Sequence, residues 1–198
     1  MGTAGRPREF AKDIALEQAL VLFWAKGYRS TSIQALSSAM DIDPKSLYAA
    51  FGSKEELYLS ALDRYAATYD ARIWGHMPPG QTPRERVCAV LERAARYLIR
   101  TDVTPGGCLI TLAALAEETT DRISQIARGH RAYRLGLLRT WLRAAKEQGE
   151  LRPSADIVDL SLLFFAGFNG ITVQARDGAN ADELTAIANL LIAAWPGR

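Results

Sequence analysis

Helix start signals recur along this 198-residue chain, and they constrain its fold more than any other feature of the sequence. Asp43 precedes a proline, and the segments from Ser53 to Glu56 and from Thr82 to Glu85 have the pattern of capping boxes. Gly27 and Gly52 follow apolar periodic segments, where glycine commonly ends a helix. Sustained alternation of apolar and polar residues, which is typical of strands, is missing. The sequence therefore predicts an all-α protein.

The same signals divide the chain into about nine helices. The expected helices span residues 8–26, 32–39 and 44–51, a long segment from residue 54, and then 83–101, 108–118, 121–148, 154–176 and 181–194. We expect two parts without a flexible linker. Residues 1–53 form an N-terminal module of three helices, and residues 54–198 form a larger helical domain.

Composition indicates a soluble globular protein, with 48% hydrophobic and 23% charged residues. The longest apolar run, Leu160 to Phe168, is too short to span a membrane, and the N-terminus has no secretory pattern. We therefore expect a cytoplasmic protein with no membrane partner. The net charge of +2 does not indicate nucleic-acid binding by itself, so a DNA-binding surface must arise from the placement of basic groups.

Residue patterns that support catalysis or metal binding are missing. Cys88 and Cys108 lack zinc-site spacing, and the chain has two histidines far apart. Neither a catalytic triad nor a phosphate loop is present, and Glu117 and Glu118 point to different sides of a helix. We expect no catalytic residue, no metal and no cofactor. An enzyme on a helical scaffold is the remote alternative.

The two short helices, 32–39 and 44–51, are joined by residues 40–42 in a helix-turn-helix pattern. With Leu47 and Phe51 turned inward, the second helix exposes small and polar groups that suit a DNA major groove. Hydroxyl and amide groups at the start of the first helix suit a phosphate. The predicted DNA-binding residues are Thr31, Ser32, Gln34, Lys45, Ser46, Tyr48 and Lys54. A helix-turn-helix that binds only protein is an alternative.

These residues resemble the TetR/AcrR family of repressors. The resemblance rests on YRSTSI at residues 28–33 and SLYAAFGSKEEL at residues 46–57, and it covers roughly residues 8–62. It implies an all-α homodimer that binds double-stranded, near-palindromic operator DNA and is released by a small-molecule inducer in an inward-facing cavity. Asp41 stands where the family's turn usually carries glycine. Since aspartate tolerates a left-handed conformation, we expect the turn to be kept.

The helix expected at 154–176 is apolar nearly all round, which indicates burial on several sides. We expect it to form the dimer interface together with the last helix, and the alternative is an internal core helix. The predicted interface residues are Phe164, Phe165, Gly167, Leu184, Ile187 and Leu191.

Aromatic residues of the larger domain are candidates for binding an apolar or amphipathic ligand, although core packing explains such residues equally well. The candidates are Tyr65, Tyr69, Trp74, Tyr97, Tyr133, Trp141, Phe168 and Asn169. Residues 84–152 carry a surplus of basic groups, which fits an anionic ligand or solvated helix faces.

Cys108 is a redox candidate. It lies at the start of an expected helix, where the helix dipole favours a thiolate. The stretch from Gly107 to Ile110 also resembles TetR-like regulators of which some sense electrophiles through a cysteine. A buried structural cysteine is the alternative.

Overall fold

The computed structural model describes residues 5–113 and 120–197. Within these residues every regular element is helical and no strand occurs, so the all-α prediction is confirmed. The elements are α1 (Gly5–Lys26), α2 (Ile33–Met40), α3 (Pro44–Phe51), α4 (Lys54–Tyr65), η1 (Ala66–Asp70), α5 (Ala71–Trp74), α6 (Pro83–Tyr97), α7 (Leu109–Ala113), α8 (Asp121–Glu147), α9 (Ile157–Asp177) and α10 (Ala181–Ala193). The segments α4, η1 and α5 follow one another without a break and form one rod.

The capping residues explain where these helices begin. The Asp43 carboxylate accepts the backbone N–H of Ser46 at the start of α3, and Thr82 and Glu85 form a complete capping box at the start of α6. Helix α6 ends at Tyr97, earlier than predicted, because the chain turns into a loop in which Gly107 N–H bonds the Leu98 carbonyl. The predicted helix 108–118 is seen as α7, and its last part lies outside the described residues.

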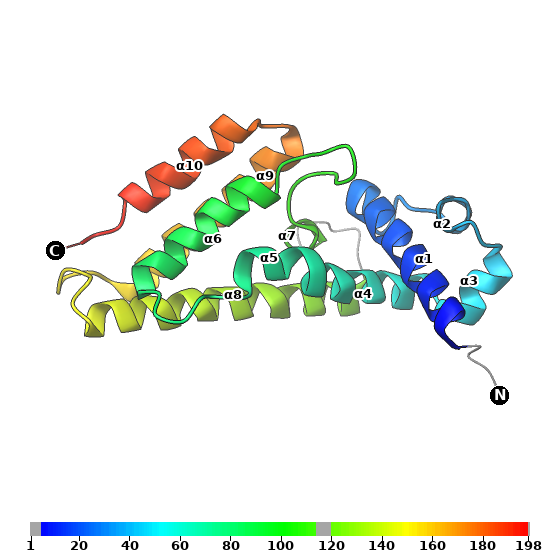
Figure 1. The fold of residues 1–198 in the computed structure, drawn as a ribbon, viewed down its shortest axis with the longest axis horizontal. Coiled ribbons are helices and arrows are strands. Elements are labelled where there is room, and N and C mark those ends of the chain that lie inside the picture. The colour runs from blue at the N-terminus through cyan, green and yellow to red at the C-terminus, as the bar shows by residue number, and fades with distance from the viewer. Residues whose placement is uncertain (1–4, 114–119, 198) are drawn as a thin grey trace.

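The molecule is elongated, with two ends joined by long helices (Figure 1). Helices α1, α2 and α3 gather at one end, and α6, α9 and α10 gather at the other. The rod of α4, η1 and α5 runs from the first end into the second, with α8 beside it. The rod therefore contacts both ends of the molecule.

Aromatic packing fixes the rod to α1. The Phe23 ring meets Tyr58 edge-on at 4.8 Å between centroids, and the Trp24 ring meets Tyr65 in the same way at 4.9 Å. All four side chains are buried. Because edge-to-face pairs add to the free energy gained by burial, this layer makes α1 and α4 one packing unit.

Helix α9 has the apolar character predicted for the helix at 154–176. The segment Ile157–Asp177 is long and apolar enough to cross a membrane by length and composition, so the expectation that no segment reaches this length was wrong. Its inner side packs Phe164, Phe168 and Ile171 into the core. Its outer side remains open, since only 28% of its most apolar window is buried.

Candidate nucleic-acid interface and sensor pocket

The turn between α2 and α3 depends on Asp41. Its φ of 53° lies in the left-handed region, and the following Ile42 N–H bonds the Ser37 carbonyl. The predicted persistence of this turn is therefore confirmed. At the start of α2, the Ser32 hydroxyl oxygen accepts the Ala35 N–H at 3.1 Å.

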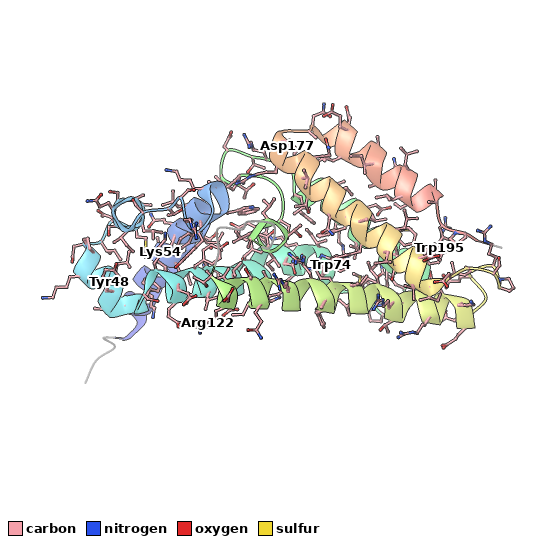
Figure 2. All side chains as sticks on the ribbon, turned by 180° about the vertical axis from the view of Figure 1, so that it is seen from behind. Tyr48, Lys54, Trp74, Arg122, Asp177 and Trp195 are labelled. Carbon is pink, nitrogen blue, oxygen red and sulfur yellow. The ribbon has the colours of Figure 1, made fainter. Side chains whose placement is uncertain are left out.

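Helix α3 has a buried side and an open side. Leu47 is fully buried and Phe51 nearly so, whereas Lys45 and Ser46 are exposed and Tyr48 is 46% exposed. The Ser46 hydroxyl donates to the Asp43 carboxylate at 2.6 Å, which fixes the first turn of the helix. Figure 2 shows Tyr48 at the end of the molecule farthest from Trp195. The open side of α3 is therefore available to a partner as large as DNA.

Thr31 does not belong to this open surface, and its predicted role as a phosphate contact was wrong. The side chain is fully buried, and its hydroxyl donates to the Gly27 carbonyl at 2.6 Å. It closes the turn that follows α1. Ser32 and Gln34, which were predicted with it, are both exposed.

Lys54 lies at the start of the rod and beside the helix-turn-helix (Figure 2). Its ammonium group is 4.5 Å from the centroid of the Tyr28 ring, in cation–π contact. Partial burial lowers the pKa of Lys54. Lys12 of α1 similarly lies 5.0 Å from the Phe51 ring. The contact between Lys12 and Phe51 was not predicted, because local spacing in the sequence does not show that α1 meets α3.

The first turn of the rod is tied to α8. The Thr120 hydroxyl donates to the Glu55 carboxylate, and Arg122 forms an ion pair with Glu56. Figure 2 shows Arg122 below the start of the rod. Farther along, Tyr69 donates its hydroxyl to Glu17 of α1 at 2.6 Å. Burial, together with the Glu17 carboxylate, raises the pKa of Tyr69 to about 12.

A pocket of about 240 Å³ lies between the rod and α8, and we call it the rod pocket. The polar and aromatic residues that line it are Asp70, Trp74, His130, Tyr133 and Arg134, and the remaining lining residues are alanine and glycine. Of the residues predicted to bind a ligand, it includes Trp74 and Tyr133.

The other predicted ligand residues lie elsewhere. Tyr65 is buried against Trp24, and Tyr69 bonds Glu17, so both serve the contact with α1. Tyr97 is 41% exposed beneath the Arg96 guanidinium. Phe168 packs behind Trp74 at 5.0 Å. Trp141 is buried and Asn169 half-buried, and neither is among the described lining of the rod pocket.

Arg134 and Asp70 are residues of this pocket that the sequence did not single out. Arg134 is 1% exposed, and its Nη2 donates to Asp70 Oδ1 at 2.6 Å. Burial opposes its charge, but Cys108 and Asp70 hold the pKa of Arg134 above its usual value. The centroids of the Trp74 and Phe168 rings lie within 6 Å of its guanidinium carbon. In the sequence it is one arginine among many on an amphipathic helix, which predicts a solvated side chain.

Cys108 is fully buried at the start of α7. Its sulfur lies 3.5 Å from both terminal nitrogens of Arg134. The preceding Gly106 has φ of 82°, and a Cβ there would lie 2.7 Å from the Ala175 carbonyl oxygen. The segment is therefore pressed against α9, and a reagent in solution reaches the thiol only after this packing opens.

The predicted dimer residues divide by their exposure. Phe164 and Leu184 are buried within the protomer, and a Cβ on Gly167 would lie 2.4 Å from Leu191 of α10. For Phe164 and Leu184 the prediction was wrong, because their surroundings are filled by the same chain, whereas the half-buried Gly167 stays a prediction. Phe165, Ile187 and Leu191 are partly buried on the core.

A different set of apolar residues, on the outer side of α9, forms an exposed stripe. Its members recur about once per helical turn and are Val158, Leu162, Ala166, Gly170 and Val173, all exposed. Apart from the backbone of α9 and the two chain neighbours, no atom of the described residues lies within 4 Å of a Cβ built on Gly170. We call this set the α9 stripe. Its small central residues leave room for a second helix to approach closely.

Comparisons with known proteins agree with this architecture. The profile of bacterial regulatory proteins of the tetR family matches residues 15–61, and that of the tetracyclin repressor-like C-terminal domain matches residues 83–190. The HTH-type transcriptional repressor ComR of Escherichia coli K12 is 29% identical over 194 residues, covering 97% of this chain and 92% of ComR.

Solved structures give the same result. A cysteine-substituted mutant of the TetR family transcriptional regulator CifR, complexed with 26bp double-strand operator DNA, superposes with a TM-score of 0.80 at 33% identity, covering 93% of this chain and 96% of that one. A TetR transcriptional regulator from Chloroflexus aurantiacus reaches a TM-score of 0.83 at 26% identity over 95% of each chain. The chain therefore belongs to the TetR family of bacterial regulatory proteins, which are DNA-binding regulators of transcription and not enzymes.

Proposed function

We propose that the protein is a cytoplasmic repressor that binds a near-palindromic operator as a homodimer and leaves it when a small-molecule inducer binds. Residues 1–53 are the DNA-binding part, and residues 54–198 bind the inducer and the second subunit. The observation that carries this proposal is the open side of α3, where Lys45, Ser46 and Tyr48 are exposed above a buried Leu47. An α-helix of this kind reads base edges in the major groove.

The second subunit covers the α9 stripe. A two-fold axis brings the same stripe of both subunits together, and α10 supplies Leu190, which is 73% exposed. The four helices then form a bundle that sets the spacing of the two α3 helices. Operator half-sites separated by about one DNA turn or somewhat more follow from this symmetry.

The inducer acts through the rod. It prefers the conformation in which the two α3 helices cannot reach both half-sites, and a ten- to hundred-fold release requires a preference of about 1.4–2.7 kcal/mol. The contacts of Glu55 and Glu56 with α8 support this route, because they join the sensor helix to the DNA end of the rod.

Selection of bound fragments from a random DNA library, followed by footprinting, tests the proposal. We expect an inverted repeat and an affinity that falls steeply with salt, as phosphate contacts require. A non-palindromic site would contradict the symmetric dimer, and a salt slope near zero would contradict phosphate contacts. If the selection enriches no particular sequence, the protein does not recognise an operator and the proposal is wrong.

Oxidation or alkylation of Cys108 is the alternative trigger. It predicts that Cys108→Ser abolishes release of DNA by diamide or quinones while the affinity for DNA stays intact. The inducer model predicts that this variant still responds to the inducer. The complete burial of Cys108 supports the inducer model, since a dissolved oxidant does not reach the sulfur in the packed protein.

A further inference from the structure

Two residues that line the rod pocket carry hydrogen-bond donors without an acceptor in the described part of the chain. The Nε of Arg134 and the indole Nε1 of Trp74 are both buried, and neither has a hydrogen-bond partner among the described residues. Both residues line the pocket. A buried donor without an acceptor costs free energy. Two such donors on residues of one pocket therefore indicate that an acceptor is missing there. A ligand that carries hydrogen-bond acceptors would satisfy them.

The charges around the pocket favour a negative ligand. Among its described lining, Asp70 is the one carboxylate, and the 2.6 Å contact with Arg134 already neutralises it. His130 lies on the same wall, and Arg131 follows on α8, with its Nη1 buried and unpaired in the described part of the chain. Arg131 is a basic group beside the pocket that no carboxylate of the described lining balances, so an anion suits the site better than a cation.

The rest of the wall is apolar or aromatic. Trp74 is buried, while Tyr133 is 67% exposed. Figure 2 shows Trp74 at the middle of the molecule, above α8. The guanidinium of Arg134 is fixed by the two rings beside it, so its N–H groups are pre-oriented for a planar, bidentate partner.

We infer that the rod pocket binds a small organic carboxylate with an apolar body, whose anionic group takes the place of Asp70 on Arg134. This inference rests on the proposed function and names the chemical class of the inducer. Arg134 is covered almost completely, and Asp70 is the wall residue that holds its Nη2. A ligand therefore reaches the guanidinium by exchange with the Asp70 carboxylate.

This exchange acts directly on the rod. Asp70 is the last residue of η1, a five-residue π-helical turn between α4 and α5. Such turns are irregular and are frequent at functional sites. Once Asp70 loses its partner, its buried charge is uncompensated and the side chain moves toward water. The turn that carries it then shifts, and the shift reaches Lys54 and α3 through α4.

Benzoate, benzamide and benzylammonium test the ligand class, because they share size and shape but differ in charge. Binding is followed by titration of the Trp74 indole N–H resonance, which the Trp74→Phe variant identifies. We expect saturable binding of benzoate at millimolar concentrations and at least tenfold weaker binding of the other two. Equal binding of benzamide, tighter binding of benzylammonium, or no saturable shift with benzoate would overturn the inference.

Asp70→Asn provides a gain-of-affinity test that damage to the fold does not imitate. The variant removes the charge that competes for Arg134, so we expect benzoate to bind about tenfold tighter, equivalent to about 1.4 kcal/mol. Arg134→Gln should abolish benzoate binding, whereas Arg143→Gln, at an exposed position of the same helix, should leave it unchanged. Unchanged affinity in Asp70→Asn would contradict the exchange.

Operator binding is measured in parallel without benzoate. If benzoate binds as expected but the protein binds no operator, the pocket stands and the proposed function fails. If the operator binds and benzoate does not, the proposed function stands and the ligand class fails.

Discussion

Arginine substitutions two residues apart on α9 should have different effects, because the two positions lie on opposite sides of the helix. Leu162 lies in the α9 stripe and is 49% exposed, whereas Phe164 is 1% exposed. In Leu162→Arg the arginine points into solvent in a single protomer, but into the interface in the proposed dimer. In Phe164→Arg an unpaired charge is buried in the core of each protomer.

The magnitude follows from the exposed fraction. Full burial of a leucine is worth about 1.5–3 kcal/mol, so the half left open contributes about 1 kcal/mol per subunit and about 2 kcal/mol per dimer. Loss of this term weakens dimerisation about 30-fold, since each 1.4 kcal/mol is tenfold. Desolvation of two unpaired arginines adds further cost, and we expect a total weakening of at least about 100-fold.

Sedimentation velocity over a range of concentrations, with circular dichroism on the same samples, measures both effects. Leu162→Arg should sediment as a folded monomer with unchanged helix content, and Phe164→Arg should be unfolded. The control is Val103→Arg, which changes a 74% exposed apolar residue in the loop after α6 and should stay dimeric. If Leu162→Arg dimerises as strongly as the unmodified protein, the α9 stripe is not the interface.

Three further predictions follow from particular contacts. Gly170→Ala, which meets no neighbouring atom, should stabilise α9 of the monomeric Leu162→Arg protein by up to about 1 kcal/mol in thermal unfolding, whereas Gly167→Ala should gain less because Leu191 must move. Equal gains would show that α10 does not pack closely there. Lys54→Ala, at the start of the rod, should weaken binding to all DNA sequences about equally, and Tyr48→Phe should separate the contribution of the hydroxyl from that of the ring. A sequence-dependent effect of Lys54→Ala would assign it to a base. Burial raises the pKa of Tyr69 from 10.0 to about 12, so its contribution to stability is complete below pH 10 and is lost as the pH rises toward 12. Phenolate absorbance, followed together with circular dichroism, should show this loss of stability, and Glu17→Gln should lower the pKa of Tyr69. Titration of all tyrosines near pH 10 would contradict this prediction.

Local signals predicted the fold well because helix starts depend on residues close in sequence. Asp43, Ser53 and Thr82 each cap the helix that their pattern indicated, and Asp41 adopts the left-handed conformation expected of it. The open side of α3 followed from the same periodicity, since the burial of Leu47 places Lys45 and Tyr48 outward.

The rest of the site could not be predicted, because it depends on contacts between residues that are far apart in the sequence. Asp70 and Arg134 are 64 residues apart, and nothing near either one indicates the other. Helix α9 is apolar on nearly every side, so its sequence does not distinguish the side that packs on α10 from the side left open. Gly167 and Gly170 illustrate this, since the first faces Leu191 and the second faces open space. Thr31 was misassigned because its hydroxyl bonds a carbonyl of the preceding turn.

Base preference of the Lys45→Ala variant tests most directly whether α3 reads the operator. Lys45 is exposed on the first turn of α3, where a groove-binding helix contacts base edges. Selection from one random DNA library with the unmodified protein and with Lys45→Ala should yield inverted repeats that differ at one symmetric position per half-site, with a loss of about 1–3 kcal/mol on the original operator. If both proteins select the same sequence with equal affinity, α3 does not present Lys45 to the bases, and the proposed orientation of the helix in the groove is wrong.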